Sequence, residues 1–189
     1  MAKAKTSESG GEGKGDVSLP PRLPDVTPLE SDDAHDDFPE VIDGLQPGQS
    51  VALLCVNREE SREGLKATLE SLAYVVDIPA AADHALQRLR FNQYHVILLD
   101  DEWEGQSPNP IVGYLAGLTM NVRREMFVVL IGQRFKTSDH FQAFVESVNL
   151  TLHPDDLPQL ATILKGGMRD HERFYRVFTE CLIEAGKKI

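Results

Sequence analysis

The sequence has few basic residues, few cysteines and no long apolar run. Its 19 Lys and Arg residues stand against 30 Asp and Glu, which gives a formal net charge of −11. Nucleic acids and anionic membrane surfaces attract basic proteins, so this balance argues against either as a partner. No segment approaches the roughly 18 consecutive apolar residues that a membrane helix needs. The first residues contain no apolar core of a secretory signal, and we therefore predict a cytoplasmic protein.

The two cysteines, Cys55 and Cys181, lie far apart and show no metal-type spacing. Cys55 sits within an apolar run, which is typical of a buried thiol in a reducing compartment. The sequence also lacks a Gly-rich phosphate loop, a Gly-x-Ser-x-Gly nucleophile motif and a histidine pair at metal-ligand spacing. These absences predict no catalytic residues, no bound metal and no resident cofactor.

Residues 1–48 form an acidic tail without helical or strand periodicity. They carry 11 Asp and Glu against 4 Lys and Arg, so the tail holds −7 of the net charge of −11. Its Gly-Gly and Pro-Pro pairs and its acidic clusters predict disorder. The tail is either a flexible arm that binds a partner or a linker that aids solubility.

The rest of the chain alternates short apolar runs with helical patterns. The predicted strands are 50–56, 74–78, 95–99, 127–131 and 150–152. The predicted helices are 59–73, 83–91, 109–121, 139–148 and 156–185. This alternation predicts an α/β fold with a doubly wound, five-stranded parallel sheet of flavodoxin type, in the order 2-1-3-4-5. We expect a domain at 49–165 and a helical extension at 166–189.

The stretch that organises the domain is Val96–Leu99, followed by Asp100, Asp101 and Glu102. Four apolar residues in a row predict a strand that is buried on both faces. Open α/β sheets with this strand order place their ligands beyond the carboxyl ends of strands one, three and four. The acidic residues therefore lie where a site is expected. Asp101 and Glu102 are either metal-binding oxygens or part of an acidic surface loop.

The order of these landmarks resembles the receiver domain of bacterial two-component response regulators over residues 49–165. Arg62–Tyr74 resembles the family's first helix and the start of its second strand, and Val96–Asp100 resembles the strand that ends in the phosphorylated aspartate. His153-Pro154 stands where the family has Lys-Pro. The resemblance implies the receiver fold, with Asp100 at the phosphoacceptor position and Mg²⁺ as the cofactor of phosphoryl transfer.

The chain departs from the family pattern at most positions of that site. Asp100 remains, as a vestigial phosphoacceptor. A shifted register is the only way to bring Glu59 or Glu60 into the place of a metal-binding acid. Without the family's two metal-binding acids, the pocket would bind Mg²⁺ weakly. The replaced positions are Val56 and Asn57 for the two metal-binding acids, Ile131 for the hydroxyl residue of strand four and His153 for the lysine.

Three functions remain open for such a chain. The first is a pseudo-receiver that binds another protein in bacterial signalling without phosphotransfer, which the pair Val56-Asn57 favours. The second is an atypical regulator that a histidine kinase phosphorylates on Asp100. The third is a structural subunit that assembles through its last helix. Trp103, in the loop over the site, either stacks on a partner or fills the pocket.

The last helix is predicted to continue well beyond the family's length, to about Ala185. The pair Gly166-Gly167 predicts a bend near its middle. Its second half carries more apolar residues than solvent exposure favours, so it either folds back on the domain or meets another chain. We predict self-association, as a homodimer, or binding of a partner protein. The predicted interaction residues on this helix and on the preceding one are Phe141, Phe144, Phe174 and Phe178.

Overall fold

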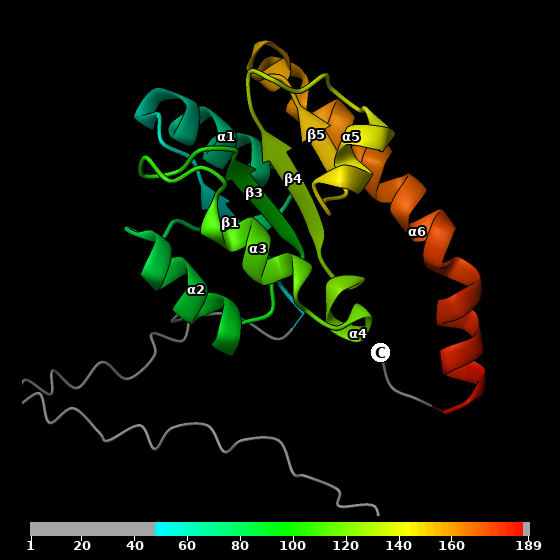
Figure 1. Cartoon of the computed structure of the whole chain (residues 1–189). Coiled ribbons are helices and arrows are strands. Elements are labelled where there is room, and N and C mark those ends of the chain that lie inside the picture. The colour runs from blue at the N-terminus through cyan, green and yellow to red at the C-terminus, as the bar shows by residue number, and fades with distance from the viewer. Residues whose placement is uncertain (1–47, 187–189) are drawn as a thin grey trace, which may run out of the picture. The chain divides into compact units, whose positions relative to one another are not determined.

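The computed structural model describes residues 48–186, so the tail predicted for 1–48 lies outside this part except for Gly48. Its five strands form one parallel sheet in the order β2-β1-β3-β4-β5 (Figure 1). This arrangement confirms the predicted fold class and strand order. The elements are β1 (Ser50–Cys55), α1 (Glu59–Ser71), β2 (Tyr74–Asp77), α2 (Ala82–Phe91), β3 (Val96–Asp100), α3 (Pro110–Ala116), α4 (Met120–Arg123), β4 (Phe127–Ile131), α5 (His140–Val145), β5 (Leu150–Leu152) and α6 (Leu160–Glu184).

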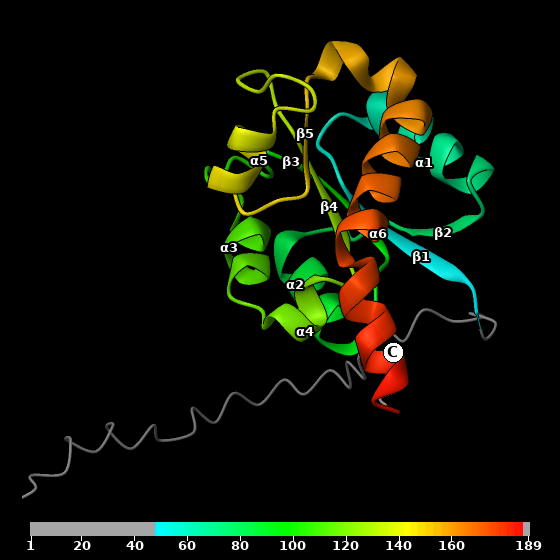
Figure 2. The ribbon, with the colours of Figure 1, turned by 90° about the vertical axis from the view of Figure 1, so that its right-hand side faces the viewer.

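Side chains of the strands alternate between two hydrophobic cores, because successive residues of a strand point to opposite faces. Leu53 and Cys55 of β1 enter the core that α2 and α3 cover. Ala52 and Leu54 enter the core that α1 and α6 cover, on the other face of the sheet (Figures 1 and 2). Helices on both faces explain why the central strands are continuous apolar runs and not alternating ones.

The register of the sheet brings the carboxyl ends of the central strands to one edge. Cys55 pairs with Leu99, Asp100 pairs with Ile131, and Ile131 pairs with Leu152. The segments that follow β1, β3, β4 and β5 therefore lie next to one another. This edge is where an open α/β sheet places its ligands.

The single helix predicted for 109–121 is wrong, because the chain forms two helices there. Asn109 caps α3 as a helix start should, since its Oδ1 accepts the N–H of Ile111 at 3.0 Å. α3 then ends at Gly117, a residue with low helix propensity. Thr119 adopts an extended backbone (φ −63°, ψ 149°) and starts α4 as its N-terminal cap. The break separates α3, which packs on the sheet, from a short exposed α4.

α5 is shorter than the helix predicted for 139–148. Ser147 has a φ of 57°, which is left-handed backbone and ends the helix. Its N–H donates to the Phe144 carbonyl at 3.1 Å, and the N–H of Val148 donates to the Ala143 carbonyl at 2.9 Å. These two bonds form a Schellman cap. Glycine is the usual residue at such a position, so the serine gave no signal of the helix end.

α6 follows a short 3₁₀ helix (Pro154–Gln159) and runs for 25 residues, about 37 Å at 1.5 Å per residue. It continues through Gly166-Gly167 without a break. Gly167 is needed for close packing, because a Cβ there would lie 2.8 Å from Cζ of Phe127. Its two buried residues, Leu160 and Leu164, are both in its first part, and the distal part extends past the strands (Figure 2). Within residues 48–186, no helix is apolar and long enough for a membrane span.

Candidate functional site

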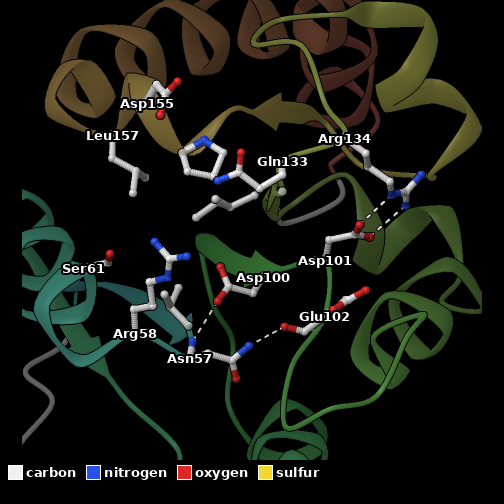
Figure 3. A pocket seen from close by; sticks show the side chains of 14 residues that line it. Asn57, Arg58, Ser61, Asp100, Asp101, Glu102, Gln133, Arg134, Asp155 and Leu157 are labelled. Carbon is white, nitrogen blue, oxygen red and sulfur yellow. Dashed lines mark hydrogen bonds and ion pairs between the residues drawn. The ribbon is translucent and has the colours of Figure 1, made fainter.

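A pocket of about 480 Å³ opens at the carboxyl edge of the sheet (Figure 3). It lies at the edge that the sequence predicted, between the ends of β1, β3 and β4 and the start of the 3₁₀ helix. Its walls combine predicted site residues with several that the sequence did not single out. The lining residues are Val56, Asn57, Arg58, Ser61, Asp100, Asp101, Glu102, Ile131, Gly132, Gln133, Arg134, Pro154, Asp155 and Leu157.

Asp100 is the last residue of β3 and lines the pocket from below in Figure 3. Burial raises its pKa above the ordinary aspartate range, although the N–H of Asn57 and the cations Arg58 and Arg62 act in the opposite direction. Its Oδ2 accepts that N–H at 2.8 Å. Its main-chain carbonyl accepts a bond from Nδ2 of the cap residue Asn109, also at 2.8 Å. These two hydrogen bonds hold Asp100 in one place at the end of β3.

The two positions predicted for metal-binding acids both line the pocket, as Val56 and Asn57. Val56 is buried and offers no side-chain oxygen. Arg62 of α1 binds the chain just after β1: its Nε and Nη2 donate to the Val56 carbonyl at 3.2 and 3.0 Å. Glu59 and Glu60 lie exposed in the first turn of α1 and do not line the pocket. The shifted register that would have brought one of them into the site is therefore wrong.

Asp101 is engaged by an arginine that the sequence did not indicate. Arg134 donates from Nε to Asp101 Oδ2 at 2.5 Å and from Nη2 to Oδ1 at 2.8 Å (Figure 3). Its Nη1 donates to Glu146 Oε1 at 2.7 Å, at the end of α5. These two carboxylates raise the pKa of Arg134, which stays charged. One guanidinium thus joins the loop after β3 to α5, across the loop after β4.

Ile131, which was predicted to replace the hydroxyl residue of strand four, lies beside Asp100 in register and carries no side-chain donor. The next residue, Gly132, is required by close packing. A Cβ there would lie 2.9 Å from Cβ of Asp101 and 3.0 Å from the Phe135 ring. The pocket therefore has a hydrocarbon wall at Ile131, beside Asp100.

His153, which was predicted to stand at the family's lysine position, does not line the pocket. Its Nδ1 accepts the N–H of Asp155 at 3.2 Å, and it acts as the N-cap of the 3₁₀ helix. Its own N–H donates to Oγ1 of Thr137 at 2.9 Å. The His153 side chain therefore caps the 3₁₀ helix and does not enter the pocket.

Trp103 was predicted to stack on a partner or to fill the pocket, and both predictions are wrong. It is 4% exposed and belongs to the core under α2 and α3. The backbone around it closes a tight loop, in which Trp103 N–H donates to Gln106 O at 3.3 Å and Gln106 N–H donates back at 2.9 Å. An apolar ring in an acidic loop is equally consistent with docking and with burial, which is why the sequence alone did not decide.

Several pocket residues were missed in the sequence, chiefly Arg58, Ser61, Gln133 and Arg134. The guanidinium of Arg58 points toward the Asp100 side of the pocket (Figure 3). Each of these residues lies within a few positions of a predicted strand end. That spacing was the available signal, since loops after the carboxyl ends of parallel strands line the site.

A second hollow, of about 540 Å³, lies between α5 and α6, which flank β5 (Figure 2). Phe144 and Phe174 line it from the two helices. The predicted interaction residues Phe141, Phe144 and Phe174 are 76–80% exposed, and Phe178 is 40% exposed. We call the surface formed by Phe141, Phe144, Val145, Phe174 and Val177 the α5–α6 face; all five side chains are exposed.

The distal part of α6 is attached to the domain through His171. Nε2 of His171 lies 2.9 Å from the Arg124 carbonyl and Nδ1 lies 3.1 Å from Nδ2 of Asn149. Its ring packs edge-on against Phe127, and the Arg124 guanidinium lies 4.0 Å above the ring of Phe178. Phe174 lies on the same side of the helix, three residues after His171, but its side chain stays 79% exposed.

Solved structures of receiver domains match this fold. A Chloroflexus aurantiacus protein named as a response regulator is 16% identical, with a TM-score of 0.53 and coverage of 64% of this chain and 98% of that one. The receiver domain of Francisella response regulator 1452 is 14% identical, with a TM-score of 0.50 and coverage of 64% and 98%. A fusion that carries the trimeric coiled coil of yeast Spc42 is 16% identical, with a TM-score of 0.50 and coverage of 75% and 98%.

No family model matches the sequence, and no curated protein matches it either. The likeness is thus carried by three-dimensional arrangement: strand order, parallel register and the position of the pocket. Identities of 14–16% establish a common fold and nothing narrower. The described part of this chain has the fold of response-regulator receiver domains, with a long C-terminal helix.

Proposed function

We propose that this protein is a signalling component of receiver fold that works by binding a protein chain through its α5–α6 face, without accepting a phosphoryl group. The observation that carries the proposal is the exposure of Phe144 and Phe174 on opposite walls of one hollow. Contiguous exposed apolar surface of this kind marks interaction sites in soluble proteins. Burying one such side chain contributes about 1.5–3 kcal/mol.

A second copy of this chain is the occupant that we propose. A two-fold dimer needs only one self-complementary patch, so a single apolar face suffices. On the distal part of α6, Phe174 and Val177 are exposed and supply the apolar surface of that patch.

The groups that line the pocket support the proposal that Asp100 accepts no phosphoryl group. Transfer to an aspartate needs cations to neutralise the charge that develops on the phosphoryl oxygens. Val56 supplies no metal ligand, and His153 is turned away to cap the 3₁₀ helix. Arg134 is already paired with Asp101 and Glu146. The competing function, phosphorylation of Asp100 by a histidine kinase, has one observation in its favour: Asp100 remains at the end of β3 and lines the pocket.

Light scattering on a concentration series tests the proposed association. The wild-type chain is expected to show the mass of a dimer, and Phe174→Asp is expected to be a monomer at the same concentrations, because a carboxylate cannot be buried in an apolar interface without cost. Met120→Asp is the matched control, since Met120 is also an exposed apolar residue, 58% accessible, but lies on α4. A monomeric wild-type chain over the whole series would overturn the proposed dimer.

Intact mass after incubation with acetyl phosphate and MgCl₂ tests the second half of the proposal. We expect an unchanged mass. Addition of one phosphoryl group per chain, lost in Asp100→Asn, would instead establish the phosphorylated regulator.

A further inference from the structure

The receiver fold implies a Mg²⁺ ion at this pocket, and the residues present do not fit one. Mg²⁺ prefers an octahedral shell of oxygens, of which the protein supplies one or two carboxylates. Both carboxylate oxygens of Asp101 are taken by Arg134. Oδ2 of Asp100 accepts the N–H of Asn57, and the Glu102 carboxylate points away from Asp100 (Figure 3). Within residues 48–186 no cluster of three or more Asp, Glu, His or Cys residues forms a metal site.

One residue occupies the centre of this arrangement. Asn57 donates its N–H to Asp100 Oδ2 at 2.8 Å and its Nδ2 to the main-chain carbonyl of Glu102 (Figure 3). Its Oδ1 accepts the N–H of Glu104 at 3.0 Å. Three hydrogen bonds from a single residue thus join the end of β1 to the end of β3 and to two points of the following loop.

The loop that Asn57 holds is connected further into the domain. Glu104 Oε2 accepts the N–H of Ala82, at the start of α2, at 3.0 Å. Trp103, between the two loop residues that Asn57 binds, is buried in the core under α2 and α3. Loss of the Asn57 contacts would therefore loosen a loop that carries both a core side chain and the cap of a helix.

We infer that Asn57 has the structural role that a divalent cation has in a receiver pocket. It joins the end of β1 to the acidic end of β3 and to the loop that follows β3. A cation would do so by sharing oxygens, whereas Asn57 does so with two N–H groups and one carbonyl. Asn57 is a positioning residue, and the pocket keeps its shape whether or not divalent cations are present. This role of Asn57 is independent of the α5–α6 face, because neither Asn57 nor the residues that it binds belong to that face.

The substitution Asn57→Asp tests this directly. It replaces the Nδ2 donor by an oxygen, so the bond to the Glu102 carbonyl is lost and a carboxylate oxygen faces that carbonyl oxygen. Thermal unfolding is measured in EDTA and in millimolar MgCl₂ at matched ionic strength. For wild type we expect the same Tm in both. For Asn57→Asp we expect a Tm lower by about 4 °C or more in EDTA, and recovery of most of that loss with MgCl₂, because the cation then bridges the new oxygens.

Two controls separate the role of Asn57 from general effects. Asn57→Ala is expected to lose stability in EDTA and to gain nothing from MgCl₂, since it adds no ligand. Asn121→Asp adds the same charge on exposed α4 and is expected to show neither effect. Hydrogen exchange at the Glu104 amide, which donates to Asn57 Oδ1, is expected to be slow in wild type, fast in Asn57→Ala and independent of MgCl₂ in both.

Three results would each overturn the inference. One is a wild-type Tm that rises saturably with MgCl₂, because the pocket would then bind the cation. The second is an Asn57→Asp chain as stable in EDTA as wild type. The third is an Asn57→Asp chain that is destabilised but does not respond to MgCl₂, because Asn57 would then not occupy the place of a cation.

Discussion

The pocket and the α5–α6 face differ in how many of their side chains already have partners within the protein. In the pocket, Asn57, Asp101 and Arg134 are bound to one another or to neighbouring loops at 2.5–3.0 Å. On the α5–α6 face, Phe144 and Phe174 are about 80% exposed and contact little of the domain. A group that is already satisfied has little to gain from a ligand, whereas an exposed apolar side chain gains by burial.

The comparison shows where binding free energy remains available in this chain. In a phosphorylatable receiver the pocket changes state and a distant surface responds. Here Arg134 binds Asp101 on the pocket side and Glu146 at the end of α5, so one ion-pair chain links the pocket to the α5 side of the α5–α6 face. Under the proposed function, the free energy for recognition comes from the α5–α6 face, and the pocket helps to hold that face in one arrangement.

Removal of the distal helix is the change with the largest expected effect on this comparison. A chain that ends at Lys165 keeps Leu160 and Leu164, the two buried residues of α6, and loses Phe174 and Val177. We expect a folded monomer with wild-type far-ultraviolet circular dichroism per remaining residue and no association in light scattering. A truncated chain that is unfolded, while the full chain is monomeric, would show that the distal helix belongs to the core.

A pair of glycine substitutions on α6 measures how closely that helix approaches the sheet. Gly167→Ala places a Cβ 2.8 Å from the Phe127 ring, and overpacking of this kind costs about 1–3 kcal/mol. Gly166→Ala meets nothing within 4 Å and is expected to stabilise the helix by about 0.5–1 kcal/mol. Urea denaturation of both variants checks the opposite signs. Equal effects at the two positions would contradict the close contact.

The fold could be predicted because each strand coincides with a short run of apolar residues. The site was harder to predict because it is formed by contacts between loops. Val96–Leu99 indicates a buried strand without reference to anything else in the chain. The division of 109–121 and the early end of α5 depend on Thr119, whose backbone is extended, and on Ser147, whose backbone is left-handed, although the helix periodicity continues through both positions. Trp103 packs in the core and Arg134 pairs with Asp101, and both contacts are with segments that are distant in the sequence.

The ion pairs of Arg134 are expected to contribute less to stability than the packing at Gly167. Arg134→Met removes the bidentate pair with Asp101 and the bond to Glu146, and should lower the free energy of unfolding by about 1 kcal/mol, since Arg134 is half exposed and screened by solvent. Arg176→Met, which breaks an exposed pair with Glu180, is the control and should change stability much less. The difference between the two should shrink in high salt. No difference at low salt would mean that the chain of pairs does not fix α5.

The smallest expected effect is the pH dependence of Asp100. Burial raises its pKa in the folded protein above the value in the unfolded chain, so the folded state binds the proton more tightly. Its ionisation therefore destabilises the fold as the pH rises through the range above the ordinary aspartate pKa. Asp100→Asn should be more stable than wild type at neutral pH, and this advantage should disappear under acid conditions. An advantage that instead grows on acidification would contradict the burial of this carboxyl group.

The central claim is that association through the α5–α6 face does not depend on phosphorylation at the pocket. The most direct test is the molar mass of the full chain by light scattering, measured with and without acetyl phosphate and MgCl₂. The account predicts the mass of a dimer in both samples, with no change on treatment. A monomer that becomes a dimer only after treatment, and fails to do so in Asp100→Asn, would contradict it.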